Sequence, residues 1–532
     1  MLNSFVKWLP YLAILLVYIA GANLDIMEVD AAQYASISWE MLKSGEFLEV
    51  LDRNEDYLDK PPLLFWLSAF SMKLFGFGNW QYKLPSILFS VLGIFSTYKL
   101  GERLYSSKIG HHAAMIFGGT LAMIMINNDI KTDTILVSSI VFSIWTLVSF
   151  IQTQQWKFLI GAALGITAAM LTKGPIGLMM PALAIGAHVL LKRNFQVLLN
   201  WKWLVLILMI AVLLVPMMFG LHRQHGPNGL KFYFWTQSFG RITGENAWRN
   251  NTTPLYFTHV FLWSFLPWTL LGIAALFSEL RNLKEGLRKP DSEFYLIGGV
   301  VMVWIGLSFS KFKLPHYIFV VYPLISILAA KYAHHLKGHS TWAWIQLVLS
   351  SLAALFLAVL LYYAFSGGGL WLPIVLVICV VLAFILFFNL YRASQVILPS
   401  FILSIGIGLG LNMHFYPQLL PYQANAFVGK WIVDNEIPEE NFVGFSTGGR
   451  ALDFYAKRII PWMEDAESTL AIIKPGVIVY ANESRYHDLL KYGAVPKREI
   501  VLQNFEVQNL TIQFLNPKTR EAALRKNYLL FY

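Results

Sequence analysis

WLPYLAILLVYIAGANLDIMEVDAAQYASISWEML, residues 8–42, joins an apolar run to a polar stretch that carries Glu28 and Asp30. A helix needs roughly 20 mainly apolar residues to cross the hydrocarbon core of a bilayer, which is about 30 Å thick. The run is long enough for that crossing, so the two carboxylates stand where a first membrane span reaches water. Charges often flank a span, and this position alone leaves open whether either carboxylate is catalytic or simply solvated.

Composition places the whole chain in the membrane class. Of its 532 residues, 56% are hydrophobic and 14% are charged, whereas soluble domains carry about 25% charged residues. The one cysteine, Cys379, lies in an apolar run, which excludes a disulfide framework and a thiolate metal site. Lys and Arg in cytoplasmic loops account for much of the net charge of +10, so we expect no nucleic-acid partner.

Thirteen apolar segments are predicted to span the membrane. They are residues 8–23, 82–100, 111–127, 134–151, 157–171, 175–191, 202–220, 256–277, 294–310, 314–331, 342–364, 370–390 and 396–415. No small-residue cleavage site follows the first, which we therefore expect to be retained. With a cytoplasmic N-terminus, basic residues dominate most inner loops, and the first outer loop holds ten acids against five bases, which agrees with the positive-inside rule. An odd number of spans puts the C-terminus outside.

Two domains are predicted. Residues 1–420 form the membrane domain, with outer loops at 22–83 and 221–255, and residues 421–532 form an outer α/β domain. In the first loop, AAQYASISWEMLKSGE and PPLLFWLSAFSMKLFGFG have the amphipathic pattern of helices lying along the membrane interface. In the tail, FVGFS, IIPWM, GVIVYA, EIVLQ and LTIQFL read as strands, and RALDFYAK, DAESTLAII and SRYHDLLKYG read as helices.

Charged residues gather at the predicted outer ends of the spans. Such groups are costly at membrane depth and are functional hypotheses by default. They are Asp129, Lys131 and Asp133 in NNDIKTDTILV, Lys173 in AAMLTKGPIG, and Lys311, Lys313 and His316 in LSFSKFKLPHYIF. Lysines neutralise phosphate, a carboxylate orients or deprotonates an acceptor, and aromatic interfacial helices admit a lipid tail. This combination indicates a lipid-linked phosphate as substrate.

Five motifs in order resemble the polyprenyl-phosphate-dependent glycosyltransferases of the GT-C type, above all the lipid A aminoarabinose transferases and the protein O-mannosyltransferases. They run from about residue 24 to 325: VDAAQYASISWEMLKSGEF with YLDKPPLLFW, KTDTILV, LTKGP, FYFWTQSFGRITGENAW with SFLPW, and KLPHYIFVVYPLIS. The resemblance implies a GT-C membrane fold and transfer of a sugar from a polyprenyl-phosphate donor to a lipid (lipid A-like) or protein acceptor, by an inverting single displacement. It also implies a bacterial inner membrane with a periplasmic active site.

The resemblance also suggests roles for individual residues. Asp30 matches an essential first-loop aspartate of the family and Asp133 a second acidic residue of its cavity, and with Glu28 they form the predicted catalytic set. The predicted ligands of the donor phosphate are Lys60, Tyr57, Arg241, Lys173, Lys313 and Tyr317. Asp30 and Asp133 are alternatively helix N-caps, and Lys60 an interfacial lysine that snorkels.

Two departures from the family pattern affect these predictions. Ala31 follows Asp30, where the family usually has glutamate. Ser238 and Asp59 stand where aminoarabinose transferases carry a histidine and a glutamate that hold a metal in the family. Zinc needs three or four ligands, so we expect no zinc at Asp59. The sequence requires no cofactor, and a divalent cation held with His316 stays open.

The identity of the acceptor also stays open, because a hydroxyl acceptor needs a general base whereas a lipid phosphate is already largely ionised. Two rival functions come from other classes. A lipid or polysaccharide transporter or flippase would be expected to show paired repeats with broken helices, and the sequence contains no such repeat. A non-catalytic scaffold that presents the tail domain leaves the acidic first loop and the DKPP motif unexplained.

Overall fold

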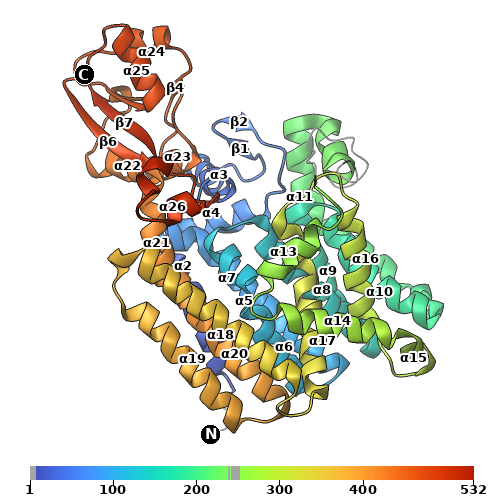
Figure 1. Cartoon of the computed structure of the whole chain (residues 1–532). Helices are drawn as coiled ribbons and strands as arrows, with labels where there is room; N and C mark the ends of the chain where they lie inside the picture. The colour runs from blue at the N-terminus through green and yellow to red at the C-terminus, as the bar shows by residue number, and fades with distance from the viewer. Residues whose placement is uncertain (1–6, 238–239, 241–251) are drawn as a thin grey trace.

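A computed structural model describes residues 7–237, 240 and 252–532. Figure 1 shows a bundle of long helices with the N-terminus at one end and a smaller α/β unit at the other. Seven described helical segments are long and apolar enough to cross a membrane, or eight if one bent pair counts as a single span. Each of the thirteen predicted spans falls on a helix or a helix pair of this bundle, and the chain is an integral membrane protein.

The bundle is formed by helices that span most of the chain up to about residue 420. Their bounds are α2 (Leu9–Ala22), α5 (Asn79–Leu104), α6 (Ser107–Gly118), α7 (Leu121–Asn128), α8 (Thr132–Thr153), α9 (Trp156–Lys173), α10 (Ile176–Lys192), α11 (Lys202–Lys231), α13 (Tyr256–Ser264), α14 (Thr269–Arg281), α15 (Leu283–Arg288), α16 (Tyr295–Ser308), η3 (Pro315–Val321), α17 (Tyr322–His335), α18 (Thr341–Ala364), α19 (Trp371–Asn389), α20 (Arg392–Gly410) and α21 (Tyr416–Leu419). The last apolar helical stretch runs from Arg392 to Tyr422, across the predicted domain boundary.

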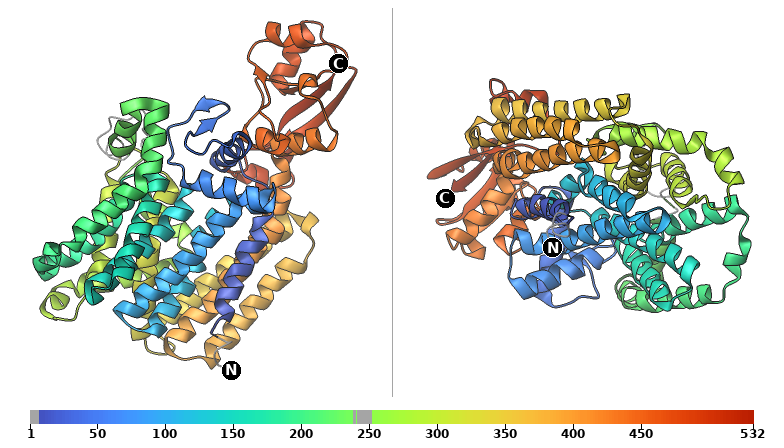
Figure 2. Two further views of the ribbon diagram at one scale, coloured as in Figure 1. Left: turned by 180° about the vertical axis from the view of Figure 1, so that it is seen from behind. Right: turned by 90° about the horizontal axis from the view of Figure 1, so that it is seen from below.

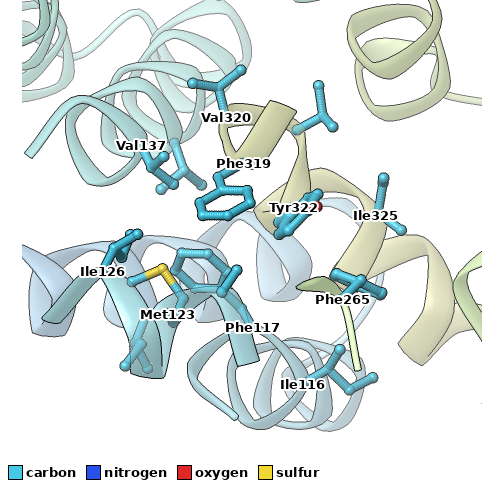
Figure 3. Close-up of a cluster of buried hydrophobic side chains, with 14 of the residues drawn as sticks. Ile116, Phe117, Met123, Ile126, Val137, Phe265, Phe319, Val320, Tyr322 and Ile325 are labelled. Carbon is cyan, nitrogen blue, oxygen red and sulfur yellow. The ribbon is translucent and has the colours of Figure 1, made fainter. Parts of the chain in front are cut away.

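One predicted span, 111–127, is broken into α6 and α7, which meet at 50°. The break follows from the sequence between them, because Gly118 and Gly119 lower helix propensity and the Thr120 hydroxyl accepts the Met123 N–H as an N-cap. Figure 3 shows Phe117 and Met123 at this bend, packed against Phe319 of η3 and other buried apolar side chains. The bend directs α7 toward the end of the bundle that carries the α/β unit.

Glycines bring helix backbones into close contact in the bundle. A Cβ atom at Gly101 of α5 would lie 2.8 Å from the Cα of Gly110 on α6. A Cβ at Gly93 would lie 2.7 Å from Oγ of Ser138 on α8. Close approach at small residues is the usual packing mode of helices in lipid, where apolar burial alone gives little drive for association. These contacts fix α5, which connects the first outer loop to the rest of the bundle.

Two helices form in the first outer loop, as predicted: α3 (Asp30–Ser44) and α4 (Leu63–Phe75). A small hairpin lies between them, with β1 (Leu51–Asp52) paired to β2 (Glu55–Asp56). Its two turn residues, Arg53 and Asn54, both have positive φ, as a two-residue hairpin turn requires. Helix α4 exposes Phe70, Leu74 and Phe75, whereas α3 is buried over much of its length.

The tail forms a five-stranded mixed sheet in the order β4-β3-β5-β7-β6. The helices and strands of the tail are α22 (Ala424–Asp434), β3 (Phe442–Phe445), α23 (Arg450–Ala456), β4 (Trp462–Met463), α24 (Ala466–Ile472), β5 (Ile478–Asn482), α25 (Glu483–Lys491), β6 (Arg498–Asn504), α26 (Ile512–Leu515), α27 (Arg520–Ala523) and β7 (Arg525–Phe531). Strand β3 is parallel to β4 and β5, and β7 is antiparallel to β5 and β6.

One strand prediction in the tail is wrong. LTIQFL forms the short helix α26, because the Thr511 hydroxyl accepts the Phe514 N–H and starts a helical turn. Ile512 is 87% exposed there, which a buried strand would not allow. The fifth strand is instead β7, from Arg525 to Phe531, which the sequence did not predict. The other four predicted strands and the three predicted helices are present.

Candidate active site

Asp30 lies at the point where the first-loop helix meets the bundle. It is the first residue of α3, Val29 occupies the N-cap position, and no side chain caps the helix. The alternative that Asp30 is an N-cap is therefore wrong. Lys131 Nζ, in the turn between α7 and α8, donates to Asp30 Oδ2 at 3.1 Å and lies 3.3 Å from Asp129 Oδ2. Lys131 thus bridges two carboxylates of different elements.

The charges around Asp30 decide its protonation. Burial opposes ionisation of Asp30, but the charge and hydrogen bond of Lys131, together with His316 and Lys60, outweigh burial and hold its pKa below the ordinary value. Burial raises the pKa of Asp129, against the opposing effect of Lys131. Asp30 is therefore an ionised carboxylate near neutral pH, with basic groups on its accessible side.

A second buried cluster lies beside the first and joins four more predicted residues. Lys173 Nζ, at the end of α9, donates to Asp133 Oδ1 at 2.6 Å. His316 Nε2 lies 3.4 Å from the other oxygen of Asp133, and Lys173 Nζ lies 4.0 Å from the ring centroid of Tyr317. Asp133 is 1% and Lys173 9% exposed. The N-cap alternative for Asp133 is also wrong, because Lys131 occupies that position and no side chain caps α8.

Two pockets meet near these clusters. The first is lined mainly by apolar side chains of α10 and α16, with Asp133, Lys173 and Tyr317 also in its wall. The second is lined by Tyr57, Lys60 and both prolines of the DKPP motif, together with residues of α11. Gln237 belongs to both linings, and its amide donates to the backbone oxygen of Asp59. A lipid chain and a phosphate group would therefore find apolar and basic walls next to each other.

Three predicted site residues do not join the clusters in the described structure. Glu28 faces the α/β unit, where its carboxylate accepts from Asn425 Nδ2 at 3.0 Å. Lys313 donates to the backbone oxygen and the hydroxyl of Thr252, at 3.2 and 3.3 Å. Arg241 lies outside the described residues, as does Ser238. The roles of the remaining predicted residues in binding and catalysis stay predictions.

The two possible cation ligands, Asp59 and His316, have other partners in the described structure. The Asp59 carboxylate is paired with the ammonium of Lys60, and His316 faces Asp133. Among the described residues, no three His, Cys, Asp or Glu side chains come together as metal ligands. A divalent cation at Asp59 and His316 stays a prediction.

Sequence reasoning did not assign a role to Lys131 or to Gln237. The signal for Lys131 was present, because a lysine stands between two aspartates in a tight turn, DIKTD. The sequence did not show that a third carboxylate, 101 positions earlier in the chain, shares the same ammonium. Gln237 lies within the motif FYFWTQSFGRITGENAW, but nothing in the sequence singles it out.

Lys131→Met is expected to move the acidic limb of the activity profile to higher pH. Lys131 is the strongest of the groups that lower the pKa of Asp30, so its loss lets burial raise that pKa. Because its pKa is lowered, Asp30 stays ionised down to lower pH in the wild type. Without Lys131 it becomes protonated at a higher pH. The check is the pH dependence of activity, with Lys73→Met as a control for charge loss in the exposed part of the first loop. An unchanged acidic limb would contradict the pairing.

The arrangement of the bundle, the first-loop helices and the α/β unit matches the fold of a solved membrane protein. The computed structure superposes on ArnT from Cupriavidus metallidurans bound to undecaprenyl phosphate with a TM-score of 0.78 and 18% identity, over 99% of this chain and 98% of that one. The apo form of ArnT from Cupriavidus metallidurans gives a TM-score of 0.74 with 19% identity, over 99% of this chain and 98% of that one. This likeness shows the fold.

Sequence relatives confirm the resemblance. The chain is 28% identical over 326 residues to an undecaprenyl phosphate-alpha-4-amino-4-deoxy-L-arabinose arabinosyl transferase of Edwardsiella ictaluri, covering 59% of this chain and 57% of the relative. A protein of the same description from Shewanella sediminis is 26% identical, covering 64% of this chain and 62% of that protein. The match thus spans about three fifths of the length of both relatives. The family model of dolichyl-phosphate-mannose-protein mannosyltransferases matches residues 59–219.

Proposed function

We propose that this protein transfers a sugar from a polyprenyl-phosphate donor to a lipid acceptor at the outer face of a bacterial inner membrane. The observation that carries the proposal is the pair of adjoining pockets with apolar and basic walls, together with the Asp30 carboxylate, which accepts from Lys131. The named donors of the arabinosyl transferase relatives support undecaprenyl phosphate as the carrier and 4-amino-4-deoxy-L-arabinose as the sugar.

In the proposed reaction, Lys60 and Tyr57 hold the donor phosphate. The sugar leaves when its anomeric C–O bond to that phosphate breaks, while the acceptor oxygen attacks the opposite face, so the anomeric carbon inverts. Lys60 stabilises the charge that develops on the departing phosphate, a type of interaction that commonly contributes most to enzymatic rate enhancement. No covalent sugar–enzyme intermediate forms in this single displacement.

The charges around Asp30 favour a phosphate acceptor of the lipid A type over a hydroxyl. A general base works best with a pKa near the operating pH, whereas the pKa of Asp30 is lowered. An acceptor phosphate is already ionised and needs a cation beside it, which Lys131 supplies next to Asp30. Asp30 then orients the acceptor rather than removing its proton. The mannosyltransferase family model makes a protein hydroxyl the second candidate.

The orientation proposed is a cytoplasmic N-terminus with the site and the α/β unit in the periplasm. The first-loop helices and the α/β unit lie at one end of the bundle and the N-terminus at the other (Figure 2). The positive-inside pattern of the loops supports this direction. Membrane-impermeant labelling of cysteines placed at residues 55 and 284 in intact cells would test it, since we expect only residue 55 to react from outside.

The test of the reaction is transfer in nanodiscs by the purified full chain. Radiolabelled undecaprenyl-phosphate aminoarabinose is supplied with lipid A in one arm and with membrane proteins in the other. Label on lipid A supports the proposal, and label on protein selects the second candidate. Donor that stays intact in both arms would overturn the proposed activity, provided the protein remains folded.

Lys60→Met is expected to raise the KM for the donor by about 10- to 100-fold, which corresponds to the free energy that a hydrogen bond to a charged group contributes. The pocket that contains Lys60 also contains Tyr57, so the substitution removes the charge and leaves most of the wall in place. Donor titration with a fixed acceptor measures the effect, and Lys73→Met removes a lysine from the exposed face of α4 as the matched control. Equal KM values for the two variants would place the donor phosphate elsewhere.

A further inference from the structure

The helix α23 of the C-terminal unit holds the first outer loop at several points. Arg450 donates from Nε and Nη2 to the two oxygens of Asp52, at 3.2 and 3.0 Å. Asp52 also accepts from Gln33 of α3 at 2.7 Å. Arg53 pairs with Asp453 and lies 3.7 Å from the ring centroid of Trp462. Charged groups of the hairpin and of α23 are thus joined across about 400 positions of sequence.

Among the first-loop residues that contact the C-terminal unit, Glu28 is close to Asp30 in the sequence, two positions before it. Its backbone N–H donates to Gln423 Oε1 at 2.9 Å, and its carboxylate accepts from Asn425 Nδ2 at 3.0 Å. Burial raises its pKa, and hydrogen bonds from Asn425 and from the Ala451 N–H of α23, with the charge of Arg450, oppose that rise. Glu28 is therefore bound by the C-terminal unit through both its backbone and its side chain.

A glycine makes room for this carboxylate. A Cβ atom at Gly449 would lie 2.8 Å from Glu28 Oε1 and 2.7 Å from Asn425 Nδ2. Gly449 has a φ of 169°, which is extended backbone that alanine also adopts. The requirement for glycine at this position is consequently one of space for Glu28.

We infer that Glu28 is a positioning residue through which the C-terminal unit sets the place of Asp30 in the active site. The inference rests on the proposed function. Glu28 stands two residues before Asp30, which is the first residue of α3. Gln423, Asn425 and Ala451 of the C-terminal unit each form a hydrogen bond with Glu28. Lys131 holds the Asp30 carboxylate from the bundle side. The catalytic geometry therefore depends on the register between the C-terminal unit and the bundle.

Figure 1 shows this arrangement, with α3 beside α23 and above the bundle helices. Helix α3 packs on α23 on one side and on α4 on the other. A shift of α23 would thus be transmitted to the first turn of α3. The pocket of Lys60 also includes residues on either side of the hairpin, but its opposite wall belongs to α11.

Gly449→Ala is the sharpest probe, because it adds one methyl group against Glu28 and removes no charge. We expect kcat to fall by about 10- to 100-fold, the cost of misplacing a reacting group by about an ångström, with the donor KM changed less than about twofold. The acidic limb of the pH profile should move to higher pH, since Asp30 moves away from Lys131. The titratable groups that act on Asp30 are Lys131, His316, Lys60 and Asp129, which shares Lys131 with it. A loss of folded protein would lower the rate without moving that limb.

A complementary pair of substitutions keeps the inference falsifiable if Gly449→Ala does not fold. Asn425→Asp places a second carboxylate beside that of Glu28 and should lower kcat by at least about tenfold. Adding Glu28→Gln to the same chain removes this repulsion and should recover most of the lost kcat. Glu28→Gln alone keeps an acceptor for Asn425 and Ala451, so its loss should be smaller than that of Asn425→Asp. A loss for Glu28→Gln as deep as that for Asp30→Asn would mean that Glu28 is itself catalytic and would overturn the positioning role.

Hydrogen exchange at the amides of residues 29–34 separates this inference from the proposed activity. Faster exchange there in Gly449→Ala, with no change for the control Gly286→Ala, supports the mechanical link even if the wild type transfers no sugar. The inference would be overturned if a folded Gly449→Ala protein had the same hydrogen exchange, the same kcat and the same acidic limb of the pH profile as the wild type. The proposed function would remain intact in that case. Gly286 is a suitable control because an added Cβ there would meet its nearest neighbour at 3.4 Å.

Discussion

Asp30→Asn should lower the kcat of sugar transfer by about 10²- to 10⁴-fold, the range of a positioned acid, base or orienting carboxylate, and leave the protein folded. The amide keeps the size of the side chain but loses the negative charge that pairs with Lys131. Lys131 still lies 3.3 Å from Asp129 after the substitution, so its ammonium keeps a counter-ion. The expected loss is therefore one of chemistry and not of stability.

The measurement is label leaving the polyprenyl-phosphate donor in single turnovers, for the wild type and for Asp30→Asn in the same nanodiscs. Glu55→Gln is the matched control, because it removes a carboxylate from the exposed hairpin of the same loop. A kcat for Asp30→Asn within threefold of that for Glu55→Gln would show that Asp30 only pairs with Lys131. The active centre would then have to be sought at Asp133.

The spans were predictable because hydropathy is a local property of the sequence. A segment that crosses a bilayer must satisfy its backbone within one helix, so the thirteen apolar segments lie on helices of the structure. The bend between α6 and α7 also has a local cause in Gly118, Gly119 and Thr120. What hydropathy alone did not give was the bend itself, since the apolar run 111–127 continues through it.

The pairing of the charged residues was only partly predictable. Asp133 and Lys173 stand at outer turns 40 positions apart, and orientation alone put them on one face. Their ion pair, and the bridging position of Lys131, depend on how α7, α8 and α9 pack, which a single sequence does not encode in a readable pattern. Glu28 was grouped with Asp30 because of its position, but its partner Asn425 lies 397 positions later.

The tail shows the limit of short patterns. LTIQFL has the composition of a strand, yet the hydroxyl of Thr511 caps a helical turn there. The missed strand RKNYLLF pairs with β5 on one edge and with β6 on the other, so it stands in the interior of the sheet. Propensity for strands mainly reports packing against neighbours, and those neighbours are set by the fold.

Lys173→Met should destabilise the protein by about 3–5 kcal/mol, because it leaves a buried carboxylate without its cation. Asp133 is 1% exposed and accepts from Lys173 at 2.6 Å. The methionine fills a similar volume, so loss of packing contributes little. Thermal unfolding of the full chain in nanodiscs should show a clearly lower Tm than for the wild type. Lys99→Met is the matched control, since Lys99 pairs with Glu102 at a half-buried site where ion pairs contribute about 0–1 kcal/mol.

The double substitution Asp133→Asn with Lys173→Met distinguishes the two roles that Lys173 can have. Removing both charges of a buried pair is often nearly neutral, so the Tm should return toward that of the wild type. If activity returns as well, the pair serves the fold, and the donor phosphate is neutralised by Lys60 and its neighbours. If stability returns and the donor KM stays high, Lys173 contributes its charge to the phosphate, as the sequence predicted. A Tm for Lys173→Met equal to that of Lys99→Met would contradict the burial of the pair.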